Sequence, residues 1–219
     1  NMGEATKAAS NILDIKHNVL PVSLNCSNIF CETSSGKKFK GEEEVSYSVG
    51  NEKVKKLWLN PEVYIYKESA EKIREADLIV ICPGLLYGSI IPNFLVSGFK
   101  EAIKSSKAKI VYVCNLVTGP GTYEFNTSDF VDEIEKYLEK KVDYVICNKK
   151  KPTQKIVDKY SEEESFFVKC NLDEKTNEEN NKTRKVIKED LLVESTIGDL
   201  ITARHDAEKT SKIIMSILK

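Results

Sequence analysis

Three apolar segments that alternate with helix-like stretches constrain the fold of this chain more than any other feature. The segments are residues 78–82, 109–115 and 142–148, and amphipathic stretches at about 92–105 and 128–140 follow the first two. Continuous apolar strands that alternate with helices are typical of a parallel sheet that is buried on both faces. The sequence therefore predicts an α/β fold with a Rossmann-like, doubly wound, mostly parallel sheet.

Residues 19–66 have a different sequence pattern, in which short β-prone segments alternate with polar residues and Ser34-Ser35-Gly36-Lys37 is typical of a turn. This pattern predicts an antiparallel β subregion that contains a hairpin. Residues 1–15 carry apolar side chains at helical spacing, so we expect an amphipathic helix that packs on its apolar side. All 219 residues are expected to form one domain, with the antiparallel subregion at 19–66 and the α/β core at 68–219.

The C-terminal third predicts four further features. A helix is expected to begin near Pro152, and the apolar residues 166–170 are expected to form the last strand of the sheet. Residues 173–184 are almost wholly polar or charged, which is typical of a solvated loop. Asp206 is expected to cap a final helix that docks on the core.

Charge and cysteine content exclude several classes of protein. The chain has 33 Lys and Arg against 34 Asp and Glu, so it has no general positive field for nucleic acid, and we expect no nucleic-acid partner. Its six cysteines lack zinc-ligand spacing, and four lie in apolar runs, which favours reduced thiols in a cytoplasmic protein and no metal site. Residues 78–99 are uncharged, but prolines and glycines interrupt them, so we expect no membrane span.

Asparagines follow three of the predicted strands, at Asn115, Asn148 and Asn171. The carboxyl ends of parallel strands lie along one edge of a sheet, where open α/β sheets bind their ligands. An asparagine after a strand also commonly makes a turn. We favour the turn for Asn148 and Asn171, and a binding role for Asn115, because a long loop of small residues follows it.

The loops at 83–89 and 116–122 are both rich in glycine. Glycine lets backbone N–H groups approach a phosphate, although neither loop matches a known dinucleotide or phosphate-loop motif. The two histidines, His17 and His205, lie in no recognisable nucleophile or metal motif. Composition and spacing therefore predict a Rossmann-like binding domain and no more.

Longer motifs carry a resemblance over nearly the whole chain. The central ones read ADLIVICPGLLYGSIIPNFLVSGFKEAI (76–103), KIVYVCNLVTGPGTYEFNTSDFVDEI (109–134) and DYVICN (143–148), and the opening at 5–24 and ARHDAEK at 203–209 fit the same pattern. This combination strongly resembles the bacterial gluconeogenesis-factor (YvcK) family, the UDP-sugar-binding relatives of 2-phospho-L-lactate transferase (CofD). The resemblance implies that a UDP-sugar is the ligand.

We expect seven residues of the matched loops to line a single cleft for the nucleotide sugar: Gly84, Tyr87, Ser89, Asn93, Asn115, Thr118 and Gly119. Asn115 would hydrogen-bond the ligand, whereas Tyr87 would either stack on a base or sugar or pack as a rim aromatic. No catalytic residue is expected. Cys82, Leu85 and Gly88 depart from the glycine, serine and threonine of the family's first loop, which removes two hydroxyls.

The resemblance implies a cytoplasmic nucleotide-sugar-binding regulator of central carbon metabolism and cell shape. The alternatives are a phospholactate-type transferase and a degenerate scaffold that binds no nucleotide. Family members typically carry a glycine-rich G-G-G-T-G loop and an aspartate-rich segment near the front, and residues 1–30 match neither. We therefore expect the fold to lack this phosphate-binding segment, to bind UDP-sugars weakly or not at all, to expose an apolar edge or face of its sheet and to form a homo-oligomer.

Overall fold

A parallel four-stranded sheet forms the centre of the structure, a computed structural model that describes residues 2–173, 184–197 and 200–218. In order across the sheet, its strands are β4 (Leu78–Ile81), β5 (Lys109–Val113), β6 (Tyr144–Asn148) and β7 (Lys185–Glu189). Each strand runs parallel to its neighbour, which confirms the predicted α/β class and the parallel sheet expected from the three apolar segments. Crossover segments must therefore return the chain to the same end of the sheet between strands.

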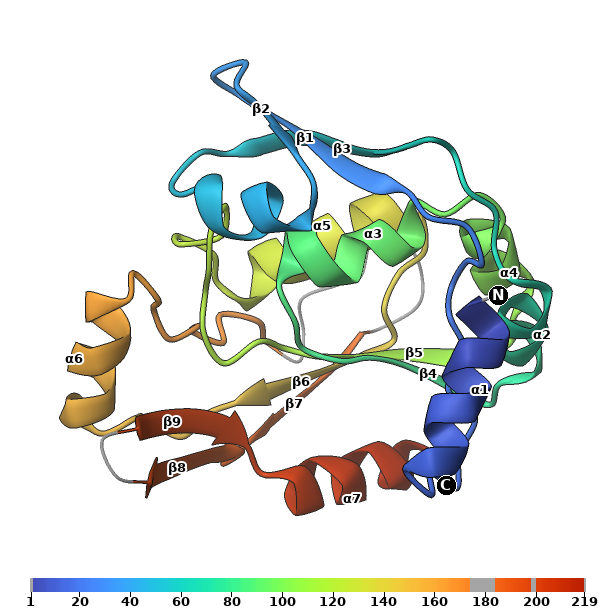
Figure 1. Cartoon of the computed structure of the whole chain (residues 1–219). Coiled ribbons are helices and arrows are strands. Elements are labelled where there is room, and N and C mark those ends of the chain that lie inside the picture. The colour runs from blue at the N-terminus through green and yellow to red at the C-terminus, as the bar shows by residue number, and fades with distance from the viewer. Residues whose placement is uncertain (1, 174–183, 198–199, 219) are drawn as a thin grey trace.

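Both faces of this sheet are buried, as β5 shows most clearly. Ile110 and Tyr112 point into the larger core, where the helix α5 (Thr127–Leu138) packs. Val111 and Val113 point the other way and contact Ile217 of the last helix. Figure 1 accordingly shows α3 (Ile91–Phe94) and α5 on one side of the sheet and α7 (Ala207–Ile217) on the other. A strand that is covered on both faces needs apolar residues at every position, which is why these segments read as continuous apolar runs.

Besides η1, which is described below, the helices are α1 (Met2–Ile12), α2 (Lys67–Glu75), the π-helix η2 (Leu86–Ile90), α3 (Ile91–Phe94), α4 (Phe99–Ser105), α5 (Thr127–Leu138), α6 (Gln154–Glu162) and α7 (Ala207–Ile217). The helices α1, α5, α6 and α7 lie close to their predicted positions, whereas η2 lies in a segment that was predicted as a loop. The single helix predicted at 92–105 is wrong, because Gly98 takes a left-handed φ of 91° and separates α3 from α4. Asp206 caps α7 as predicted, through a bond from the Lys209 backbone N–H.

The antiparallel subregion forms a smaller sheet of β1 (Asn28–Thr33), β2 (Lys38–Lys40) and β3 (Val54–Asn60), with the predicted hairpin between β1 and β2. The β-prone piece at 45–49 is instead a π-helix, η1 (Glu44–Ser48). Val45 and Val49 are buried whereas Tyr47 between them is 72% exposed, which fits a helix, because a strand would place all three side chains on one face.

The last strand of the main sheet was predicted in the wrong segment. Residues 166–170 form no strand, and Phe167 makes only an isolated bridge to Val117. The fourth strand is β7, and a hairpin of β8 (Leu192–Ile197) and β9 (Leu200–His205) follows it. Most of the loop predicted at 173–184 lies outside the described residues.

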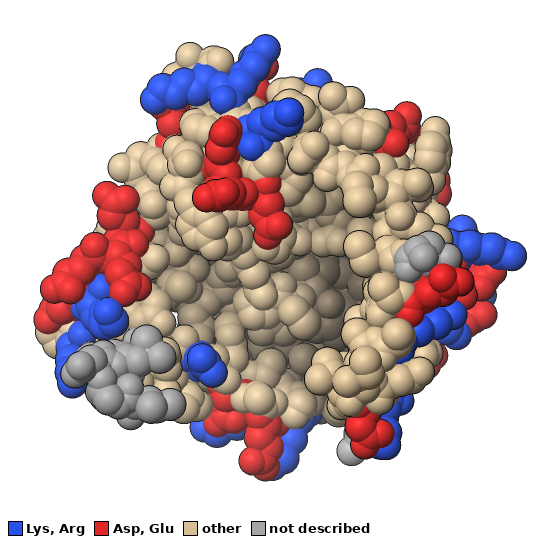
Figure 2. Space-filling model, in the orientation of Figure 1, with Lys and Arg blue, Asp and Glu red and all other residues tan. Residues whose placement is uncertain are grey.

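The edge of the sheet at β4 borders a groove of about 660 Å³, lined by apolar side chains that include Ile79, Val80 and Phe94. The space-filling view shows a face hollowed near its centre among uncharged residues, with charged residues around the rim (Figure 2). The nearby α1 differs from its prediction, because Ile12 and Leu13 are exposed rather than packed. No helix in the described part of the chain is long and apolar enough to cross a membrane.

Candidate functional site

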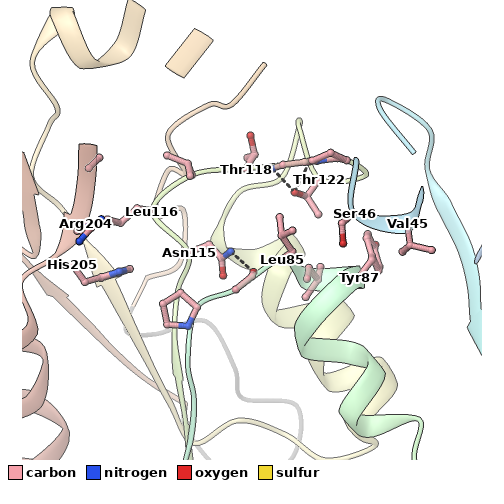
Figure 3. Close-up of a pocket in the computed structure, with 18 residues that line it drawn as sticks. Val45, Ser46, Leu85, Tyr87, Asn115, Leu116, Thr118, Thr122, Arg204 and His205 are labelled. Atoms are coloured by element: carbon pink, nitrogen blue, oxygen red, sulfur yellow. Dashed lines mark hydrogen bonds between the residues drawn. The ribbon is translucent and has the colours of Figure 1, made fainter. Parts of the chain in front are cut away.

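A cavity of about 360 Å³ lies beyond the carboxyl ends of β4 and β5. Four segments that are distant in sequence form its walls: the loop after β4, the loop after β5, Val45 and Ser46 of η1, and residues 203–205 at the end of β9. Figure 3 shows Arg204 and His205 at one end, Val45 and Ser46 at the other, and Asn115 between them. This is the position at which open α/β sheets bind their ligands.

The structure divides the seven predicted site residues between two cavities. The five that line the strand-end cavity are Gly84, Tyr87, Asn115, Thr118 and Gly119. Ser89 and Asn93 line the groove beside β4 instead, and Gly84 contributes to both cavities. The Asn93 side-chain amide donates to the Ser89 carbonyl at 2.7 Å, so it helps to hold the local helix.

Asn115 joins the two loops that form the cavity. Its side-chain Nδ2 donates to the Gly84 carbonyl at 2.7 Å, and its Oδ1 accepts from the Tyr112 hydroxyl at 2.9 Å. Tyr112 is fully buried, so its hydroxyl depends on this partner, and burial raises its pKa well above the usual value. Asn115 therefore positions the loop after β4 relative to the loop after β5.

The loop after β5 uses its backbone N–H groups within the protein. The Thr118 N–H donates to the Phe166 carbonyl at 2.7 Å, and the Gly121 N–H donates to the Gly50 carbonyl at 2.7 Å. The Gly119 N–H donates to the Thr122 hydroxyl at 3.0 Å. These three N–H groups are therefore paired within the protein and are not free to bind a phosphate.

Tyr87 is buried rather than placed at the rim. Only 3% of it is exposed, and a Cβ at Gly121 would approach its ring to 3.1 Å. Burial and the nearby Glu133 carboxylate raise the pKa of Tyr87. Its ring forms part of the core beneath the cavity, so it offers no free face for stacking.

Sequence reasoning did not assign the residues at the two ends of the cavity. Among the described residues that line it, Arg204 alone carries a full charge. His205 lies beside it, with Nε2 at 3.1 Å from the Cys114 carbonyl oxygen, and burial lowers its pKa, which favours the neutral imidazole. The ARHDAEK motif was the available signal for both residues. Ser46 lay in a segment predicted as β, so its position could not be inferred.

Asn148, which ends β6, and Asn171, which follows no strand, both have partners within the protein. The Asn148 Oδ1 accepts from the backbone N–H groups of Leu191 and Leu192. Asn171 bonds both the backbone and the hydroxyl of Ser128. The six cysteines are free thiols. In the residues that the structure describes, no cluster of three or more His, Cys, Asp or Glu side chains could hold a metal ion.

The fold and this cavity define a protein of the open α/β class with a candidate ligand site at the ends of its parallel strands. The family model described as 2-phospho-L-lactate transferase CofD matches residues 1–192. The chain belongs to this CofD family, and the resemblance found in the sequence is confirmed.

Relatives and solved structures agree with this assignment. The chain is 36% identical to a putative gluconeogenesis factor of Thermotoga maritima, over 99% of this chain and 67% of the relative. It is 29% identical to the gluconeogenesis factor of Bacillus subtilis, over 98% of this chain and 66% of the relative. A crystal structure of a Bacillus halodurans protein superposes with a TM-score of 0.83 at 30% identity, over 97% of this chain and 66% of that one. A second crystal structure of the same Bacillus halodurans protein, described as a member of the UPF0052 family, also gives a TM-score of 0.83, at 31% identity over 95% of this chain and 65% of that one. The chain thus spans about two thirds of the length of these proteins.

Proposed function

We propose that the strand-end cavity binds a nucleotide sugar, and that the protein thereby regulates central carbon metabolism and cell shape from the cytoplasm. The observation that carries this proposal is the chemistry of the cavity. Arg204 provides one positive charge at one end, and the remaining lining is uncharged, with amide, hydroxyl and carbonyl groups. Arginine suits a phosphate, and uncharged polar groups suit a sugar or a base.

Size and relatives support the same function. A volume of about 360 Å³ falls within the range of small-molecule sites. The relatives that share most of the chain carry the name gluconeogenesis factor, which concerns carbon metabolism. The six free thiols are typical of proteins from a reducing compartment, and this supports the cytoplasm.

Calorimetric titration of the full-length protein with UDP-N-acetylglucosamine tests the proposal. We expect binding by the wild type, and at least about tenfold weaker binding by Arg204→Met, because a charge-assisted hydrogen bond contributes roughly 1.5–3 kcal/mol. Lys169→Met is the matched control, since Lys169 is exposed and does not line the cavity. Absence of binding by the wild type would favour the scaffold alternative, and equal affinities of Arg204→Met and wild type would remove the phosphate role of Arg204.

We also propose that two copies of the protein associate through the β4 edge and its groove. Among the described strands, β4 has a neighbour on one side only, and the groove beside it is lined by apolar side chains. An open apolar edge favours association with another strand or apolar surface. Light scattering should give twice the mass of one chain, and Val80→Lys should shift it to the monomer. A wild-type monomer at tens of micromolar would contradict this proposal.

A further inference from the structure

Arg204 belongs to a strand that lies outside the main sheet. It is part of β9, which pairs with β8 in a separate two-stranded sheet. The position of Arg204 relative to the ends of the parallel strands therefore depends on the contacts that join this hairpin to them. His205, the next residue, makes such a contact, because its Nε2 lies 3.1 Å from the carbonyl oxygen of Cys114, directly after β5.

The hydrogen-bond partner determines which nitrogen of His205 carries the hydrogen. A carbonyl oxygen accepts and cannot donate, so Nε2 is the donor. Two influences act on the pKa of His205: burial lowers it, and the bond to the Cys114 carbonyl raises it by a smaller amount. The ring is therefore neutral at neutral pH and acts as a single donor that is directed at the end of β5.

The acceptor is a fixed point of the sheet. Cys114 is 2% exposed, and its own N–H donates to the Ile146 carbonyl at 2.9 Å. A buried carbonyl needs a donor, and in the part of the chain that the structure describes this donor is His205. Asn115 follows directly and joins the two cavity loops. The His205 bond thus ties β9 to the place where the second cavity loop begins.

Other contacts hold the hairpin at different places. The Ala203 N–H donates to the Tyr160 hydroxyl of α6 at 2.9 Å. The Asn148 side chain, at the end of β6, accepts from the Leu192 N–H of β8 at 3.1 Å. Without the His205 bond the hairpin would therefore stay attached to α6 and β6. The end of β9 that carries Arg204 would lose its direct link to β5.

We propose that His205 is a positioning residue, whose bond to the Cys114 carbonyl holds Arg204 where the phosphates of a nucleotide sugar bind. This inference rests on the proposed function. Figure 3 shows Arg204 and His205 together at one end of the cavity. Arg204 is exposed, so its guanidinium is open to a ligand. Charge-assisted hydrogen bonds are directional, so their strength depends on where the guanidinium is held.

Two amide substitutions of different length test the bond in the full-length protein, with UDP-N-acetylglucosamine as the probe. The glutamine amide nitrogen extends about as far from the backbone as histidine Nε2, whereas asparagine is one methylene shorter. His205→Asn should therefore bind about five- to tenfold more weakly than wild type, and His205→Gln within about twofold of it. His17→Asn is the matched control, since His17 is exposed and does not line this cavity.

A double-mutant cycle separates positioning of Arg204 from general support of the cavity. If His205 acts through Arg204, adding His205→Asn to Arg204→Met should cause no further loss of affinity. The same five- to tenfold loss in that background would overturn the inference, because it would show an effect that does not need the guanidinium. Equal affinities of His205→Asn and wild type would also overturn it, as would equal losses for His205→Asn and His205→Gln.

Nitrogen NMR of the ligand-free protein tests the bond itself. At neutral pH, His205 should be the neutral tautomer with its hydrogen on Nε2. His17 gives the only other histidine signals in this sequence, so His205→Gln assigns them. A hydrogen on Nδ1 of His205 would contradict the bond and overturn the inference. Absence of wild-type binding would instead remove the proposed function and, with it, the role of His205 toward the ligand.

Discussion

Replacing Glu135 with leucine should lower the free energy of unfolding by about 3–5 kcal/mol, the range for breaking a buried ion pair from one side. The Glu135 Oε1 accepts from the Arg184 guanidinium at 2.5 Å and from the Val142 N–H at 2.9 Å. The side chains of Glu135 and Arg184 are only 4% and 7% exposed. Leucine would therefore leave the Arg184 charge in the interior without its carboxylate partner.

The matched control for this variant is Glu139→Gln. Glu139 follows α5 directly, and its two oxygens bond Lys100 at 2.6 Å and Lys104 at 2.7 Å. These bonds lower the pKa of Glu139 to about 2, but the side chain is half exposed, so water and salt screen the pairs. Urea unfolding at pH 7 should therefore show a much smaller change for Glu139→Gln. A Glu135→Leu effect below about 1 kcal/mol, the level of a surface pair, would contradict the prediction.

Replacing Asn115 with alanine should weaken the binding of UDP-N-acetylglucosamine by about 5- to 150-fold. The variant leaves the Gly84 carbonyl and the buried Tyr112 hydroxyl without their bonds to the Asn115 side chain. An unpaired buried polar group costs about 1–3 kcal/mol. If the lost bonds distort the geometry in which the ligand is bound, this cost corresponds to the stated range of affinity loss. Calorimetry on wild type and variant measures the change.

Asn148→Ala is the control for the Asn115 variant. Asn148 also ends a strand and accepts from the Leu191 and Leu192 N–H groups, but it does not line the cavity. Both variants should be less stable than wild type, whereas only Asn115→Ala should lose affinity. If the two variants bound the ligand equally, Asn115 would have no particular role in holding the cavity together.

The main sheet could be predicted because its strands are buried on both faces. A run such as IVYV at residues 110–113 is apolar at every position, and few other structures produce that pattern. The strand β7 was missed because its sequence, KVIKE, mixes charges with apolar residues. Residues 166–170 were more apolar, but they do not join the sheet. The Thr118 N–H donates to the Phe166 carbonyl and the Phe166 N–H donates to the Thr118 hydroxyl, and these two bonds hold the segment against the cavity loop.

The candidate site could be predicted only where it lies in loops next to the sheet. Asn115 was found because the ends of parallel strands are known to meet at one edge. Arg204 and Ser46 approach the cavity from β9 and η1, and no local pattern indicates that either element reaches those loops. The positions of these two residues at the cavity depend on tertiary packing, such as the hydrogen bond between the Gly121 N–H and the Gly50 carbonyl. Such contacts join segments that lie about 70 residues apart and carry no short-range signal.

The four-part construction of the cavity has a thermodynamic consequence for the chain as a whole. Its walls come from positions between 45 and 205, so the complete binding surface exists only when all of these segments have folded. A ligand that requires every wall binds the native state and not a partly opened one. By mass action, a bound ligand would therefore raise the free energy of unfolding of the entire chain, and not only the stability of one loop.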